Sequence, residues 1–504
     1  MIARKSALII ATQIANGILG YIGLKFIALY MEPWQYGVVG FAFGLVSVVS
    51  IFGRLGFQKA HIKRVSEGRD LGTCIATFGS IKLVLVGLMT AIVIIGVAGW
   101  EYILGRGFES LLHQQAVYVM LAYFVLFTLS QTFIFTFKAR KEIAKAMLPM
   151  FAYNLGRIGA TVFIAVSDLG ALALAYAYLF GEIFEFALAF YFFRKYPVGK
   201  PTASSVKSYI SFAMPMAVVV ASLILMRNID KVFIQLFMYA EDVGHYFAIS
   251  NLSRFVILFV GAVGTLIFPT ISKHHASKNM REIERLTLIS ERYLSMIVFP
   301  MVVLMVVLAE PIIRVLLSNK YLPVVTVLQI LPFFVLMEAL TKPYDTQLSG
   351  MNLPRLNRNR VIIMAGSNVL LNLLLIPPDI KSIGLQTAGF GVEGAAIATV
   401  AAYGIGLAYI RYVAWRTTGI KANPRIALHA VAAGGMALAL YYVNTMVHFG
   451  RWYELMFAGL LGLGIYVFLL FIMKEFTRED YDLFMDTLNV KKMIEYIREE
   501  IKGK

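Results

Sequence analysis

The sequence predicts an all-α membrane protein with about fourteen transmembrane helices. Three observations support this fold class. Hydrophobic residues make up 59% of the 504 residues and charged residues only 15%, whereas soluble domains carry about 25% charged residues. Apolar runs of about the 20 residues that a membrane-spanning helix needs recur along the chain. Lysine and arginine are concentrated in every second loop between these runs.

The predicted spans follow one another with short loops, none of which is long enough to form a domain. In chain order the spans cover residues 6–31, 34–57, 72–98, 114–137, 147–167, 170–193, 210–238, 246–272, 293–316, 323–349, 361–377, 391–410, 426–447 and 453–473. The charged tail 474–504 follows, with apolar residues at near-helical spacing. We expect this tail to form an amphipathic helix on the cytoplasmic membrane surface.

The loop charges predict the orientation of the chain. One set of alternate loops, which includes both termini, holds 33 Lys and Arg, and the opposite set holds 4. Positively charged loops stay in the cytoplasm, so we expect a multi-pass protein of the cytoplasmic membrane with both termini cytoplasmic. The net charge of +17 then reflects topology and predicts no nucleic-acid partner. The single cysteine, Cys74, excludes an intramolecular disulfide.

An internal repeat divides the chain into two halves. Residues 23–37 and 229–244 each carry a lysine in a span, then apolar residues, an acidic turn and a glycine. The copies start six spans apart, so they cross the membrane in the same direction, as in parallel repeats. Chance similarity between apolar segments is the alternative. The predicted parts are an N-terminal lobe at 1–193, a cytoplasmic linker at 194–209, a C-terminal lobe at 210–410 and two further helices at 411–473.

Basic residues inside the spans indicate an anion-binding cavity. A charge at the centre of a membrane helix costs about 2.5–3.5 kcal/mol on insertion scales. Beyond the first turn of each span, the spans hold nine basic residues against six acidic ones, and this excess suits an anionic ligand such as phosphate. The candidate cavity residues are Lys25, Arg54, Lys82, Arg157, Arg227 and Arg254. For Arg54, near the cytoplasmic end of its span, the alternative is that the side chain extends to the membrane surface. For the deeper charges the alternative is internal pairing, with Arg227 against Asp230 on one helix face and Glu182 and Glu185 against two cations of the first half.

Several segments resemble the polysaccharide (Wzx-type) flippases of the multidrug/oligosaccharidyl-lipid/polysaccharide exporter superfamily. These segments are Glu32–Gly37, Ile229–Lys231, Val243–Tyr246, Phe268–Ser272, Asn372–Pro377 and Gly394–Thr399. The resemblance implies two six-helix lobes in a V shape, as in multidrug (MATE) exporters and the lipid II flippase, with two helices outside. It also implies a monomeric transporter, not an enzyme. Such a protein flips a polyprenyl-diphosphate-linked oligosaccharide across the membrane by alternating access, for surface polysaccharide or glycoprotein synthesis.

The resemblance further implies two sites. The superfamily's peptidoglycan-precursor flippase carries basic residues at positions that match Lys25, Arg54 and Arg254, which implies that the cationic cavity binds the diphosphate. Its sodium ion is held at positions that match Asp230, Asn368, Asn372, Ala395 and Thr399. This sequence has Asn372 where an aspartate would be expected, but its oxygen ligands still suit a small cation. The alternative is that Asp230 pairs with Arg227 and the asparagines bond between helices. We expect sodium or proton coupling and no other cofactor.

Two other functions remain open from the sequence. A multidrug exporter of the same superfamily would mostly carry cationic drugs, which a basic cavity repels, and usually has twelve spans. A membrane-embedded glycosyltransferase would need a large outer loop and acidic metal ligands near the outer surface. The predicted outer loops are all short, and the one Asp-x-Asp motif, at Asp480, lies on the predicted cytoplasmic side.

Overall fold

Helices form almost all of the structure, a computed structural model that describes residues 2–102, 108–254, 257, 270–380, 384–447, 449–477 and 480. Among these residues the strands β1 (Asp379–Ile380) and β2 (Leu385–Gln386) form one short antiparallel pair. By length and apolar content, ten of the described helices can cross a membrane, or eleven if one bent pair is a single span. The all-α membrane class is confirmed. The predicted number of fourteen spans is not, because part of span 246–272 lies outside the described residues.

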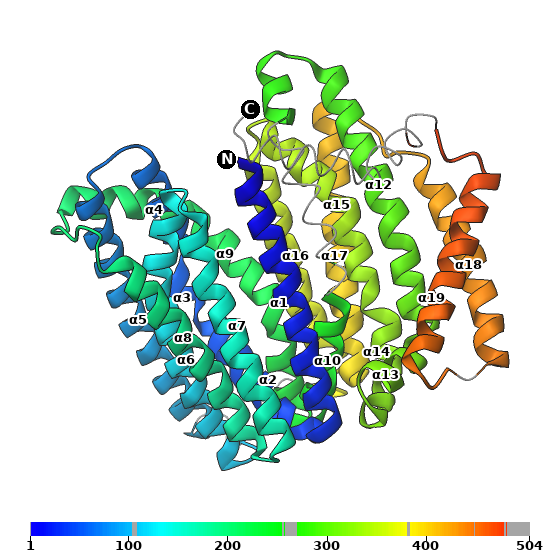
Figure 1. Cartoon of the computed structure of the whole chain (residues 1–504), viewed down its shortest axis with the longest axis horizontal. Coiled ribbons are helices and arrows are strands. Elements are labelled where there is room, and N and C mark those ends of the chain that lie inside the picture. The colour runs from blue at the N-terminus through cyan, green and yellow to red at the C-terminus, as the bar shows by residue number, and fades with distance from the viewer. Residues whose placement is uncertain are drawn as a thin grey trace.

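The first lobe is a bundle in which α7 packs against α8, α8 against α6, and α1 against α7 (Figure 1). Its helices are α1 (Ile2–Tyr30), α2 (Pro33–Val49), α3 (Ile51–Arg54), α4 (Phe57–Ser66), α5 (Leu71–Tyr102), α6 (Leu111–Ala139), α7 (Ile143–Val166) and α8 (Gly170–Phe193). Each predicted span of the first half overlaps one or more of these helices.

The second lobe contains the remaining helices. They are α9 (Ala203–Phe237), α10 (Ala240–Arg254), α12 (Met280–Val307), α13 (Ala309–Leu316), η1 (Asn319–Val324), α14 (Val325–Ile330), α15 (Pro332–Gly350), α16 (Pro354–Leu375) and α17 (Gly391–Thr418). The last two helices, α18 (Ile426–Met446) and α19 (Trp452–Ile472), pack on α12 at the edge of this lobe (Figure 1). The tail beyond Glu475 is described only at residues 476, 477 and 480, so the predicted amphipathic helix lies outside the described residues.

The second predicted span, 34–57, is a broken helix. α2 is bent by 47° against the segment that follows it. Leu55 (φ 38°) and Gly56 (φ 75°) then end α3 in the left-handed region and turn the chain into α4. Glycine adopts this conformation without the steric cost that other residues bear. The break leaves Arg54 at the end of α3, where its side chain can reach the space between the lobes.

The long helix α9 connects the two lobes. It packs on α2, α4 and α5 of the first lobe and on α16 of the second. Tyr209 near its start is buried, and its hydroxyl lies 3.0 Å from His61 Nδ1. The predicted linker 194–209 therefore extends into α9, which begins at Ala203. The preceding linker lies on the start of α5, where Gly199 N donates to the Gly72 carbonyl (3.0 Å).

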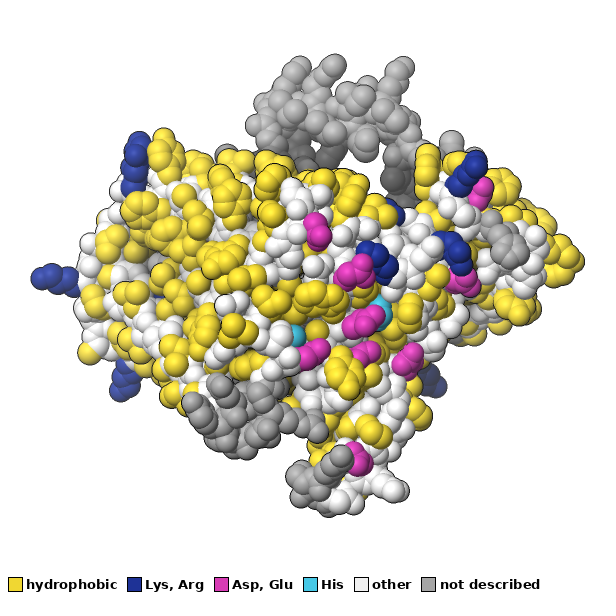
Figure 2. All heavy atoms as spheres, turned by 90° about the horizontal axis from the view of Figure 1, so that it is seen from below, with side chains coloured by type: hydrophobic (Ala, Val, Ile, Leu, Met, Phe, Trp, Pro, Cys, Tyr) yellow, Lys and Arg dark blue, Asp and Glu magenta, His cyan; other side chains and the backbone are white. Residues whose placement is uncertain are grey.

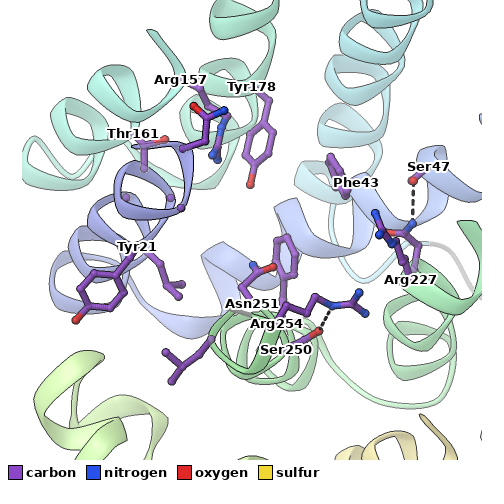
Figure 3. A pocket seen from close by; sticks show the side chains of 18 of the residues that line it. Tyr21, Phe43, Ser47, Arg157, Thr161, Tyr178, Arg227, Ser250, Asn251 and Arg254 are labelled. Atoms are coloured by element: carbon purple, nitrogen blue, oxygen red, sulfur yellow. Dashed lines mark hydrogen bonds between the residues drawn. The ribbon is translucent and has the colours of Figure 1, made fainter. Parts of the chain in front are cut away.

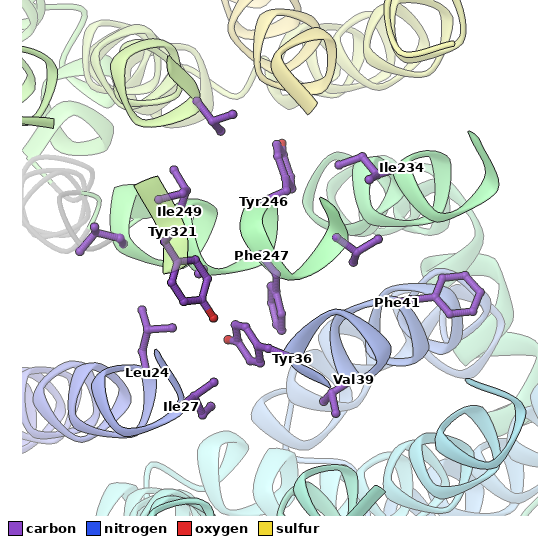
Figure 4. Close-up of a cluster of buried hydrophobic side chains, with 14 of the residues drawn as sticks. Leu24, Ile27, Tyr36, Val39, Phe41, Ile234, Tyr246, Phe247, Ile249 and Tyr321 are labelled. Carbon is purple, nitrogen blue, oxygen red and sulfur yellow. The ribbon is translucent and has the colours of Figure 1, made fainter. Parts of the chain in front are cut away.

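The lobes meet where α2 packs against α10. Figure 4 shows Tyr36 of α2 against Phe247 of α10, and their ring centres lie 4.7 Å apart. Tyr321 of η1 is fully buried beside them. In Figure 1 this contact lies toward the lower edge, while α4 and the N-terminal end of α1 lie at the upper edge. Figure 2 views the lower face, where acidic side chains gather near the centre.

Candidate functional site

A cavity of about 1000 Å³ lies between the lobes. Its walls come from α1, α2, α7 and α8 of the first lobe and from α9 and α10 of the second, together with Arg54, Tyr123 and Leu316. Figure 3 shows how arginines from both lobes line it. Four of the six predicted cationic residues are among its lining residues, namely Arg54, Arg157, Arg227 and Arg254.

A further cation, Lys231, also lines the cavity. Arg54 lies within electrostatic reach of Arg227, and Arg254 within reach of Lys231. Lys231 Nζ donates to Asn228 Oδ1 (2.9 Å), and Arg254 Nε donates to Ser250 Oγ (3.3 Å). We call Arg54, Arg227, Lys231 and Arg254 the basic wall. The sequence placed Lys231 in a span but did not assign it to the cavity.

Carboxylates do not neutralise these cavity cations. Among the described residues, no ion pair joins a carboxylate to Arg157 or to any member of the basic wall. Their aromatic neighbours include Phe127, 5.0 Å from the Arg54 guanidinium, and Phe247, 4.7 Å from Lys231 Nζ. Aromatic faces attract cations weakly compared with an ionised partner. The cavity is therefore an electropositive space that an anion can fill.

The other two predicted cavity residues lie elsewhere. Lys25 Nζ donates to the carbonyls of Val315 (2.8 Å) and Leu317 (3.0 Å), at the C-terminal end of α13. A cation is favoured there because the last carbonyls of a helix lack partners within it. Lys82 is fully buried inside the first lobe, and its Nζ donates to the Gly53 carbonyl (2.7 Å). Neither lysine is among the residues that line the cavity.

The predicted cation-site residues do come together. Asp230 Oδ1 accepts from Asn372 Nδ2 (2.8 Å), and Asp230 Oδ2 accepts from the Thr399 hydroxyl (3.0 Å). Asn368 Nδ2 in turn lies 3.4 Å from Thr399 Oγ1. Ala395 is buried on α17, one turn before Thr399. The proposed pairing of Asp230 with Arg227 is not found among the described ion pairs.

Tyr246 is a member of this cluster that sequence reasoning missed. Its hydroxyl donates to Asp230 Oδ2 at 2.6 Å. Its position sixteen residues after Asp230, in the next helix, gave no spacing signal. The side-chain oxygens of Asn368 and Asn372 are buried and have no partner. Unpartnered buried oxygens beside a carboxylate are the ligand type that a small cation requires, so the residues present fit such an ion.

Charged contacts join the lobes around the α2–α10 junction. Glu109, before α6, accepts from the backbone N–H of Ala240 (2.9 Å) at the start of α10 and from Gln235 Nε2 (2.8 Å). Lys320 of the second lobe binds Glu32 (2.9 Å) and the Met31 carbonyl (3.2 Å) after α1. Together with Lys25, these contacts hold charges against helix ends of the opposite lobe, where they interact favourably with the helix dipole.

A separate polar network ties the tail to α12. Arg292 donates to Glu475 and, through Nη2, to Asp480 Oδ2 (2.6 Å), while Tyr293 OH donates to Asp480 Oδ1 (2.6 Å). Burial alone would raise the pKa of Asp480, but the hydrogen bonds from Arg292, Tyr293 and Thr477 hold it well below its ordinary value. Asp480 is thus engaged by protein groups. Within the described residues, no group of three His, Cys, Asp or Glu side chains could hold a metal.

Comparison with known proteins places these observations in a family context. Residues 27–326 match the family model described as "Polysaccharide biosynthesis protein". The probable low-salt glycan biosynthesis flippase Agl15 of Haloferax volcanii is 23% identical over 404 residues, which cover 80% of this chain and 81% of that protein. An uncharacterized membrane protein of Methanocaldococcus jannaschii is 30% identical over 149 residues, which cover 29% of this chain and 26% of that protein.

Solved structures share the fold at low sequence identity. The lipid II flippase MurJ in an inward closed conformation aligns with a TM-score of 0.76 and 14% identity, over 92% of this chain and 98% of that one. An inward-facing multidrug resistance MATE family transporter aligns with a TM-score of 0.63 and 16% identity, over 81% of this chain and 96% of that one. The predicted MATE and lipid II flippase-like fold is confirmed.

Proposed function

The chain belongs to the polysaccharide biosynthesis protein family, and from that premise we propose that it flips a polyprenyl-diphosphate-linked oligosaccharide across the cytoplasmic membrane. The observation that carries this proposal is the cavity of about 1000 Å³ whose arginines have no carboxylate partners among the described residues. A diphosphate supplies the missing negative charge, and guanidinium groups bind phosphate oxygens in a bidentate manner.

The basic wall would hold the diphosphate. Arg54, Arg227, Lys231 and Arg254 lie within electrostatic reach of one another in pairs, so an anion placed among them relieves the repulsion between like charges. Arg157 lies across the cavity from Arg227 and Arg254 (Figure 3). Lys25 would act at the junction of the lobes rather than on the ligand, and Lys82 would support the helix break near Gly53.

Transport would proceed by alternating access, without a covalent step. In this arrangement the lobes contact each other through α2 and α10. They are farther apart at the opposite edge, where α4 and the N-terminal end of α1 lie (Figure 1). With both termini cytoplasmic, as the loop charges predict, this conformation faces the cytoplasm. The diphosphate and the sugars would enter the cavity from this side, and the polyprenyl chain would remain in lipid. One protein molecule, acting as a monomer, would then close around the ligand.

Ion coupling is the second part of the proposal. Asp230, Asn368, Asn372 and Thr399, with Tyr246 beside them, would bind a sodium ion, which supplies a positive charge that draws the helices α9, α16 and α17 together. In the arrangement described, hydrogen-bond donors of Asn372, Tyr246 and Thr399 all point at Asp230. Sodium binding would therefore require these side chains to turn their oxygens toward the ion.

A binding experiment with the purified full-length chain tests the proposal. Native mass spectrometry would compare a short polyprenyl diphosphate, the corresponding monophosphate and the uncharged polyprenol. We expect the diphosphate to bind at least about tenfold more tightly than the polyprenol, and Arg254→Gln to remove most of that difference, since a charge-assisted hydrogen bond contributes about 1.5–3 kcal/mol. Arg416→Gln, a change at an exposed arginine that contacts Tyr412, is the matched control. Equal binding of all three compounds would contradict the proposal.

A further inference from the structure

We propose that Arg157, with Tyr153 and Tyr178, forms a second anion site in the cavity that binds a carboxylated sugar, such as a hexuronate, of the lipid-linked glycan. This inference rests on the proposed function, because it concerns the glycan that the diphosphate carries. It names the chemical class of one sugar in the substrate and the wall of the cavity that recognises it.

The position of Arg157 is built by close packing of two helices. A Cβ atom on Gly181 of α8 would lie 2.7 Å from the Tyr153 carbonyl oxygen and 2.8 Å from Arg157 Cβ on α7. Only glycine allows the two helices to approach this closely. The approach brings Tyr178 of α8 beside Arg157, whose guanidinium carbon lies 5.0 Å from the Tyr178 ring centre and 5.6 Å from that of Tyr153. The cation is thus held between two aromatic rings.

The donors of Arg157 are almost unused. Its Nη2 donates to Asn154 Oδ1 over a long distance of 3.5 Å, and its Nε has no partner. No carboxylate pairs with it among the described residues. An arginine with a purely structural role in a membrane interior would be expected to have acceptors, since an unpaired guanidinium is costly to bury. Its free donors lie where a ligand carboxylate could accept two of them in the bidentate geometry that arginine favours.

Further polar atoms without partners line the cavity on helices of the first lobe. Thr161 follows Arg157 by one helical turn, lines the cavity and is 1% exposed, and its hydroxyl has no partner. Asn16 of α1 lines the same cavity, and its side-chain oxygen also lacks a partner. Hydroxyl and amide groups of this kind bind sugar hydroxyls, while the faces of Tyr153 and Tyr178 suit the apolar C–H faces of a pyranose ring. The combination of aromatic rings, neutral polar groups and one cation suits an acidic sugar better than a second phosphate.

The two anion sites lie on opposite sides of the cavity. Figure 3 shows Arg157, Thr161 and Tyr178 on one side and Arg227 and Arg254 on the other. The basic wall is formed by four cations in the charge-rich arrangement that a diphosphate requires, whereas Arg157 stands alone among aromatic rings. A ligand that satisfies both sites carries a diphosphate and, at some distance along the glycan, a single carboxylate. A neutral glycan would leave the donors of Arg157 unpaired.

The test compares two synthetic ligands that differ in one group. A short prenyl diphosphate is linked to a disaccharide that ends either in glucuronate or in glucose, and binding to the purified full-length chain is measured by calorimetry. For the unmodified protein we expect the glucuronate ligand to bind at least tenfold more tightly. Arg157→Gln should abolish this preference while it leaves the affinity for the glucose ligand within about twofold, and Arg157→Lys should restore part of the preference. Arg254→Gln should weaken both ligands equally.

The outcomes separate this inference from the proposed function. Equal affinity of the unmodified protein for the two ligands would overturn the acidic-sugar site and leave the diphosphate site standing. Equal weakening of both ligands by Arg157→Gln would also overturn it, because Arg157 would then act on the diphosphate. If neither ligand binds more tightly than the uncharged prenol, the proposed function itself fails.

Discussion

Gly37 of α2 and Gly244 of α10 allow the two lobes to meet backbone to backbone. A Cβ atom on Gly37 would lie 1.6 Å from the carbonyl oxygen of Ala240, and one on Gly244 would lie 1.9 Å from that of Pro33. The relationship is reciprocal, because the two glycines occupy matching positions of the internal repeat, as do Pro33 and Ala240. The junction of the lobes is therefore symmetric in its contacts, and a methyl group on either side prevents it.

The first prediction concerns this junction. Gly244→Ala should disfavour the described conformation by about 1–3 kcal/mol or more, which moves its population on the order of tenfold to a hundredfold. Spin labels on cysteines that replace the exposed Trp34 and Glu241, in a Cys74→Ala background, would report the separation of α2 and α10. We expect a new population at longer distance. Gly404→Ala is the control, since a Cβ there meets nothing within 4 Å. An unchanged distance distribution in Gly244→Ala would contradict this view of the junction.

The second prediction separates Lys25 from the ligand-binding cations. Lys25 binds backbone carbonyls of α13 across the lobe junction, so Lys25→Met should reduce flipping in liposomes by altering conformational exchange. Its affinity for a short polyprenyl diphosphate should stay within about twofold, whereas Arg254→Gln should lose about tenfold. Calorimetry and a liposome flipping assay measure the two quantities. If Lys25→Met lost as much affinity for the diphosphate as Arg254→Gln, Lys25 would be a ligand-binding residue and the prediction would be wrong.

The third prediction concerns sodium. An ion that binds only the folded protein stabilises the folded state. Sodium should therefore raise the midpoint temperature of thermal unfolding by about a few degrees relative to potassium or choline, measured at several pH values. Asp230→Asn should remove this rise, since it deletes the carboxylate at the centre of the cluster. Glu241→Gln, at an exposed site in the first turn of α10, should preserve it. Identical midpoints in sodium, potassium and choline for the unmodified protein would contradict sodium binding. The hydrogen bonds around Asp230 would then have a structural role.

The fourth prediction uses the loop between α6 and α7. Burial alone would raise the pKa of Glu142, but hydrogen bonds from Tyr196, Lys145 and Arg140 lower it to about 2. A carboxyl whose pKa is depressed on folding stabilises the protein above its unfolded pKa, near 4.5, and this contribution is lost as the pH falls toward 2. Glu142→Gln should therefore lower the unfolding temperature in detergent at pH 7, and the difference should shrink as the pH falls from 4.5 to 3.

The control for this change is Glu67→Gln. Glu67 is paired with Arg64 and Lys63 on a solvent-exposed part of the chain, where ion pairs contribute little. We expect no measurable change in the unfolding temperature of this variant. A pH-independent effect of Glu142→Gln would show that packing of the side chain, not its charge, stabilises the loop.

The sequence by itself determined the fold class, because hydropathy is a property of composition and period that does not depend on which helices touch. Each predicted span overlaps at least one described helix, and the repeat around Lys25 and Lys231 marked the segments that meet at the lobe junction. The resemblance to the peptidoglycan-precursor flippase pointed to the residues around Asp230, and the structure brings Asn372 and Thr399 into contact with this aspartate. Basic residues inside the predicted spans also indicated a cavity, and four of them, Arg54, Arg157, Arg227 and Arg254, line one cavity in the structure.

Only the tertiary structure decided which way a deep side chain turns. Lys25 and Lys82 are basic residues inside predicted spans, like the cavity arginines, yet they bind carbonyls at the end of α13 and of Gly53. The direction of a side chain around a helix depends on which neighbours cover each face, and that depends on packing between segments far apart in sequence. For the same reason the sequence did not predict that Tyr246 belongs to the Asp230 cluster. Nor did it predict that Arg157 lies apart from the basic wall, because the close approach of α8 to α7 at Gly181 cannot be recognised from a glycine in the sequence.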